Sequence, residues 1–117
     1  MHDLPESARA ALAGILGRAE HVEMVVDTVG SSLVLTNRRL VIIRDGANFR
    51  PTTGVRSFVL DRDLQVRIGP QLKRVIIETT GETINLFIRP HQLHAAETLV
   101  AEARRRIHQP TTRSRRA

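Results

Sequence analysis

The sequence contains no cysteine, tryptophan or tyrosine, and only three phenylalanines among its 117 residues. The lack of cysteine excludes disulfides, cysteine-ligated zinc sites and thiol catalysis. No apolar run approaches the ~20 residues of a membrane-spanning helix. The N-terminus carries early acidic residues and no long apolar stretch, so we expect no secretory signal. We therefore expect a cytoplasmic location, with peripheral contact with a membrane as the alternative.

The basic excess lies at one end of the chain. Of 18 Lys and Arg residues, 12 precede residue 103, and these balance all 12 Asp and Glu residues, so the net charge of +6 comes from the C-terminal segment. This segment contains Arg104, Arg105, Arg106, Arg113, Arg115 and Arg116. These arginines are the candidate anion-binding residues, although cations in the last turn of a helix also stabilise the helix dipole. No aromatic residue lies among them to stack on bases.

The chain is long enough for one domain, and its two ends have helical periodicity. Apolar residues recur every three to four positions over 3–18, with Asp3 as a candidate N-cap, Pro5 in the first turn and Gly17 as a candidate end. A second helix is predicted from Pro90 to Ile107, where an apolar stripe covers about a third of its surface. Pro110 follows it, and residues 109–117 are expected to be disordered.

The middle of the chain has strand periodicity. The predicted strands cover residues 22–29, 33–36, 40–44, 55–60, 65–68, 73–79 and 82–88. Turns are expected at Gly30-Ser31, Asp45-Gly46, Gly69-Pro70 and Thr80-Gly81, the last being a strong hairpin signal. Residues 46–54 are predicted to form a loop or a broken edge strand. The element order predicts a mainly β fold, in which about seven antiparallel strands form a barrel or bent sandwich that the C-terminal amphipathic helix closes.

One segment also resembles a known family. Residues 33–43 (LVLTNRRLVII) are similar to the second and third strands of bacterial PH-like domains, which share this strand pair with GRAM domains. The resemblance covers residues 20–107, and the additional N-terminal helix is similar to the YokE-type subgroup. It implies a PH-like barrel at 20–107 with a packed helix at 1–19, and the composition of residues 108–117 predicts a basic tail after the domain. It also implies a non-catalytic interaction module.

The motif consists of Leu35, Thr36, Asn37, Arg38, Arg39 and Leu40. Thr36 and Asn37 suit a strand end, where their side-chain oxygens can accept hydrogen bonds from turn amides. Arg38 or Arg39 can pair with a nearby acid, or contact a ligand. The loop between the first two predicted strands is short and has no basic residue, so the resemblance does not carry over a phosphoinositide site.

Other polar groups are candidates for chemistry. His91 and His94, three positions apart, could bind a metal with His21 or Glu97, but no complete ligand set is fixed by spacing. Asp61 and Asp63 suit a turn better than acid–base catalysis. Ser31 and Ser32 have no nearby histidine or nucleophile-elbow motif. We therefore expect no catalytic residue, cofactor or bound metal.

These observations predict an interaction module that binds a protein partner or a second copy of itself. An exposed sheet edge would accept a partner strand, while Pro51 in residues 49–54 would block pairing at that edge. The alternative is peripheral binding to an anionic membrane or nucleic acid through the C-terminal arginines.

Overall fold

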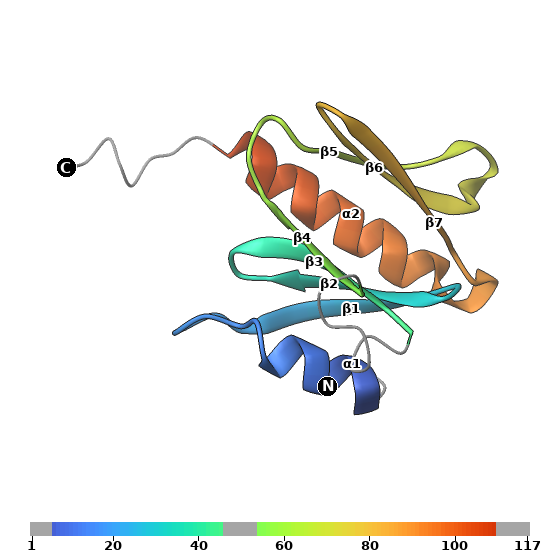
Figure 1. Ribbon diagram of the computed structural model, residues 1–117. Helices are drawn as coiled ribbons and strands as arrows, with labels where there is room; N and C mark the ends of the chain where they lie inside the picture. Colours follow the sequence, from blue (N-terminus) through green and yellow to red (C-terminus); the bar gives the residue numbers. More distant parts are fainter. Residues whose placement is uncertain (1–5, 46–53, 110–117) are drawn as a thin grey trace.

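The computed structural model describes residues 6–45 and 54–109 as two antiparallel sheets with one helix between them and another outside. Helix α2 (Leu93–His108) lies between the sheets, and α1 (Glu6–Ala13) lies on the far face of the larger sheet (Figure 1). The described part of the chain contains no helix that is long and apolar enough to cross a membrane.

The first sheet has four strands in sequence order. They are β1 (Val22–Thr28), β2 (Ser31–Thr36), β3 (Arg39–Arg44) and β4 (Val55–Val59). Every residue of β2 is buried, because both faces of this sheet are covered. Leu33 and Leu35 face the main core, whereas the alternating Val34 packs with Leu12 of α1. Strands covered on both faces read as continuous apolar runs, as in LVLT and LVII.

The second sheet has three strands: β5 (Gln65–Ile68), β6 (Arg74–Thr79) and β7 (Glu82–Phe87). The tight β6–β7 hairpin closes through Thr80-Gly81, as predicted, with Thr79 opposite Glu82. A bridge between Thr28 and Ile88 joins the two sheets on one side. No pairing connects β4 with β5, so each of these strands has one edge without a neighbouring strand in the described part of the chain.

Helix α2 supplies the core that the two sheets share. A 3₁₀ turn (Pro90–Gln92) precedes it, and Leu99, Val100 and Ile107 are almost fully buried between the sheets. Burial of each of these side chains contributes about 1.5–3 kcal/mol to folding. The stripe predicted from spacing is therefore the contact surface of this helix.

Besides the start of α2 at Leu93 rather than Pro90, three local predictions differ from the structure. Helix α1 ends at Ala13 rather than continuing to Gly17, because Gly14 begins a turn and glycine favours helix ends. The first turn is Val29-Gly30, with Gly30 at φ +82°, and Ser31 already belongs to β2. A 3₁₀ turn (Pro70–Leu72) occupies most of the β5–β6 loop. The predicted N-cap, the Pro51 segment and the C-terminal tail fall outside the described residues.

Candidate functional site

The family motif forms the end of the β2–β3 hairpin. Leu35 and Leu40 are fully buried in the core. The Thr36 hydroxyl oxygen accepts hydrogen bonds from the backbone N–H groups of Arg38 and Arg39, both 3.0 Å long. Asn37 Oδ1 accepts a hydrogen bond from the His21 N–H at 2.8 Å. These bonds hold the turn and attach it to the chain that enters β1.

Arg39 makes the most extensive ion pair of this region. Its guanidinium donates to Glu20 through Nε (2.8 Å) and Nη2 (2.9 Å), and Nη2 also donates to the backbone oxygen of Ile15. Thr36 Oγ1 donates to the same carboxylate at 2.7 Å. The hydrogen bond from Arg39 is the largest of the effects that lower the pKa of Glu20 to about 2. Arg39 therefore ties the segment after α1 to the sheet, whereas the neighbouring Arg38 is exposed.

The three described arginines of the basic segment lie in three different environments. Arg106 donates to Glu23, to Glu102 (2.8 Å) and to the backbone oxygen of Thr36 (2.9 Å). Arg105 also pairs with Glu102, and hydrogen bonds from Arg105 and Arg106 lower the pKa of Glu102 to about 2. Arg104 is exposed and has no ion pair with any described residue. Arg113, Arg115 and Arg116 lie outside the described residues.

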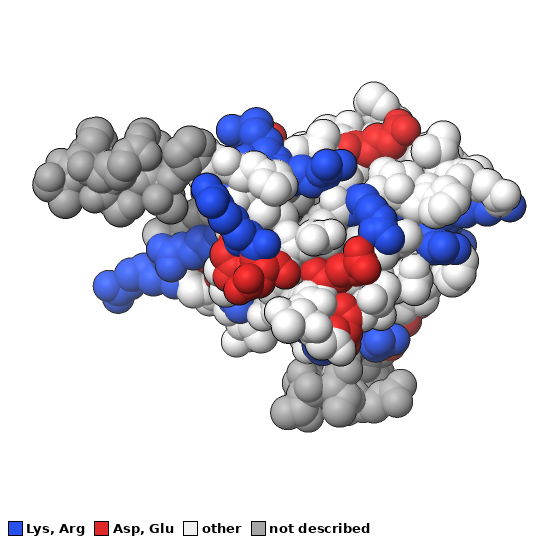
Figure 2. Space-filling model, turned by 90° about the horizontal axis from the view of Figure 1, so that it is seen from above, with Lys and Arg blue, Asp and Glu red and all other residues white. Residues whose placement is uncertain are grey.

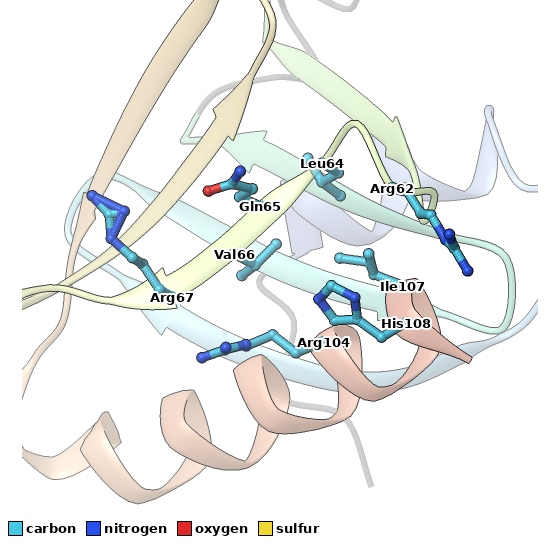
Figure 3. A pocket seen from close by; sticks show the side chains of 8 residues that line it. All are labelled: Arg62, Leu64, Gln65, Val66, Arg67, Arg104, Ile107 and His108. Atoms are coloured by element: carbon cyan, nitrogen blue, oxygen red, sulfur yellow. The ribbon is translucent and has the colours of Figure 1, made fainter. Parts of the chain in front are cut away.

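Arg104 lines a cleft between β5 and the C-terminal half of α2 (Figure 3). The cleft has a volume of about 190 Å³. Its lining residues are Arg62, Leu64, Gln65, Val66, Arg67, Arg104, Ile107 and His108. None of them is acidic. Leu64, Val66 and Ile107 are buried, so the cleft combines an apolar floor with cations at its rim.

The three arginines that line this cleft lie toward its two ends. Figure 3 shows Arg67 and Arg104 toward one end and Arg62 at the other, with the ring of His108 between them. Arg67 bonds to Glu78 on β6 at 2.8 Å, in a pair that is largely exposed. Arg62, like Arg104, has no ion pair within the described part of the chain. Two cations therefore remain available to an anionic ligand.

The cleft runs beside the unpaired edge of β5. The N–H of Gly69 bonds to the oxygen of Arg74 on β6 at 2.8 Å. Because hydrogen-bonded and non-hydrogen-bonded pairs alternate along an antiparallel ladder, Gln65 and Arg67 also direct their backbone groups toward β6. Val66 and Ile68 then direct theirs toward the open edge. This edge thus offers backbone donors and acceptors next to an apolar floor and cationic rim.

Sequence reasoning did not find Arg62, Arg67 or the cleft. The alternation in Gln65–Ile68 identified the strand, but its edge position depends on which strands pair. Two other hollows, near Arg38 and near His94, contain glutamates among their lining residues. Absence of carboxylates distinguishes the β5–α2 cleft from both.

The remaining polar candidates lie apart from this cleft's floor. Asp61 Oδ1 accepts a hydrogen bond from the N–H of Asp63 at 3.0 Å, as in an ordinary turn. His91 and His94 are exposed, and the described residues include no group of three or more potential ligands placed to bind a metal. Ser31 and Ser32 are buried at the start of β2.

The sequence matches no family model and no curated protein. The structure is similar to a crystal structure of a pleckstrin homology domain from Shewanella amazonensis SB2B, with a TM-score of 0.58 over 84% of this chain and 96% of that one. The chain has a PH-like fold. At 17% identity, this similarity shows the PH-like arrangement of two sheets around a closing helix and confirms the predicted fold class.

Proposed function

We propose that this PH-like protein is a non-catalytic interaction module that binds an extended protein segment along the unpaired edge of β5. The observation that carries the proposal is the position of this edge, beside a cleft with an apolar floor. An added strand obtains main-chain hydrogen bonds from Val66 and Ile68, while its alternate side chains enter the cleft. The partner is another protein or a second copy of this chain.

Two features of the edge support this mode of binding. Val66 is 3% exposed, so its side chain faces the core and does not obstruct the edge. The edge is also bordered by α2, whose Ile107 is likewise buried in the floor. A strand alone would bind weakly, but a strand and an adjacent helix form a groove that desolvates the bound segment.

A site-specific cross-linker tests the proposal. A photoreactive residue at exposed Gln65 should form an adduct with a partner or a second copy, and the same residue at exposed Thr80 should not. Val66→Pro removes one outward N–H, and should abolish the Gln65 adduct while circular dichroism confirms folding. Equal adducts at both positions, or none at Gln65 in cells that produce the protein, would contradict the proposal.

Self-association is tested on the purified chain. Size-exclusion chromatography with light scattering should show a dimer if the bound segment comes from a second copy, and the Val66→Pro variant should then be monomeric. If the purified chain is a monomer at high concentration, the partner that binds the β5 edge is a different protein.

The second candidate is binding of an anionic membrane or nucleic acid through the basic segment. Exposed Arg104 supports it, since this residue has no carboxylate partner among the described residues. Removal of residues 109–117 should then weaken binding to anionic vesicles or DNA, with a strong salt dependence. Unchanged binding of the truncated chain would show that residues 109–117 do not contribute to binding of the vesicles or DNA. Membership of the YokE-like or GRAM-related branch stays a prediction from the motif.

A further inference from the structure

The rim of the β5–α2 cleft has charge of only one sign. Three of its lining residues are arginines and none is acidic. This uniform charge is local, because basic and acidic side chains are interspersed over the face shown in Figure 2. Asp61 and Asp63 are exposed on either side of Arg62 in the chain, but neither lines the cleft, so the charged residues that line the cleft are all basic.

Two of these arginines have no ion-pair partner among residues 6–45 and 54–109. Glu20 and Glu102 pair with arginines elsewhere, and Glu78 pairs with Arg67. Arg62 and Arg104 have no such partner in the described ranges. A carboxylate brought by a ligand could form charge-assisted hydrogen bonds with them, which are stronger than bonds between neutral groups.

The positions of the arginines and of the apolar floor indicate which kinds of residue a bound segment would carry at its ends and in its middle. Arg104 and Arg62 mark opposite ends of the cleft, and Ile107 lies in the floor (Figure 3). A strand advances about 3.3 Å per residue, so the four residues of β5 span roughly 13 Å. A bound strand that follows β5 would therefore run from the Arg62 end of the cleft toward the Arg104 end, across the floor at Ile107 (Figure 3).

We infer that the segment bound at β5 is acidic at both ends and apolar in the middle. This inference rests on the proposed function and adds the chemistry of the partner. Arg62 and Arg104 also disfavour the pairing of β5 with a neutral or basic strand. Such a strand brings no carboxylate to pair with them, and charged side chains beside an edge strand hinder pairing. The cleft would thus select its partner by charge as well as by main-chain hydrogen bonding.

Synthetic peptides about seven residues long test the inference on the full chain. The first has Asp and Glu at both ends and Val and Ile in the middle, and the second replaces each acid by its amide. In NMR titrations the acidic peptide should shift the amide signals of Val66 and Ile68. The amide peptide should bind at least about tenfold more weakly, and salt should reduce this difference.

Charge reversal provides the decisive comparison. Arg62→Glu with Arg104→Glu should weaken binding of the acidic peptide about tenfold or more, and should create binding of a third peptide with lysines at its ends. Arg18→Glu with Arg44→Glu is the matched control, since both residues are exposed and lie outside the cleft. The control variant should bind as the original protein does.

The outcomes separate the two proposals. Equal binding of the acidic and amide peptides at β5 would overturn the acidic pattern and leave strand addition in place. Failure of all peptides to shift Val66 and Ile68 would overturn the acidic pattern, while the Gln65 cross-link decides strand addition independently. Tighter binding of anionic vesicles or an oligonucleotide through Arg62 and Arg104 would assign the cleft to phosphate groups instead.

Discussion

Replacement of Glu20 by glutamine tests the ion pair that joins the segment after α1 to the sheet. The Glu20 side chain is 2% exposed and that of Arg39 is 24% exposed. The carboxylate also accepts hydrogen bonds from Thr36 and from the backbone N–H of Gly17. Glutamine keeps the size of the side chain but removes its charge, so Arg39 would remain partly buried without a counter-ion. We expect Glu20→Gln to destabilise the protein at neutral pH.

The pKa of Glu20 gives the size of this effect. Its value is about 2 in the folded protein, against 4.5 for an unperturbed glutamate. A difference of about 2.5 units corresponds to about 3 kcal/mol at pH 7, which agrees with the cost of breaking a buried ion pair. Because the folded-state pKa is the lower one, this contribution is complete above about pH 4.5 and is lost as the pH falls through about 2.

The assay is urea denaturation followed by far-ultraviolet circular dichroism, since the chain has no tryptophan to report unfolding. A domain of this size has roughly 5–15 kcal/mol of stability, so Glu20→Gln should still fold. Glu82→Gln is the control, because Glu82 pairs with Arg56 at the surface and is 38% exposed. Its loss of stability should be much smaller.

The pH series supplies an independent check. The difference in stability between the original protein and Glu20→Gln should be constant near neutral pH and should shrink as the pH falls from about 4.5 to 2. Equal losses of stability for the Glu20 and Glu82 variants, or a difference that does not change over this pH range, would contradict a stabilising role of the Glu20 carboxylate.

Two further substitutions test the packing around α2 and β5. Arg106→Met should lower the free energy of unfolding by about 2 kcal/mol, because Arg106 bonds to two carboxylates and one backbone oxygen. Arg104→Met is the control and should change it little, since Arg104 has no ion pair in the described part of the chain. Similar losses of the two variants in urea denaturation would argue against a stabilising role for the Arg106 ion pairs. Gly69→Ala should lower the melting temperature, since its Cβ would lie 2.9 Å from Cγ of Arg74 and crowding of this kind costs about 1–3 kcal/mol. The Cβ of Gly81→Ala would have no atom of a described residue within 4 Å, so an equal fall in the two melting temperatures would contradict the steric explanation.

The local chemistry of the sequence was sufficient to predict most of the elements. Thr80-Gly81 predicted the β6–β7 hairpin, and the apolar spacing from Leu93 to Ile107 predicted the buried face of α2. The motif around Thr36 indicated a hairpin because its polar residues suit a turn. These predictions depend on residues close together in the chain, whose hydrogen bonding and periodicity vary little with the rest of the fold.

The choice between Arg38 and Arg39 needed the tertiary structure. Both arginines follow the same strand, and nothing in their spacing distinguishes them. Arg39 pairs with Glu20, which lies 19 positions earlier in the chain, because β2 and β3 lie beside the segment that enters β1. Arg106 likewise reaches Glu23 on β1, so part of the basic segment neutralises charge within the fold.

Local sequence patterns were enough to predict which segments form strands and helices, and to assign the excess charge to the C-terminal arginines. The tertiary structure alone decided which strand has an open edge and which cations surround it. Arg62 and Arg104 are 42 positions apart (104 minus 62), and they line one cleft because α2 packs against β5. The periodicity of apolar residues indicates which side of an element is buried, whereas a binding site depends on which surfaces the folded chain brings together.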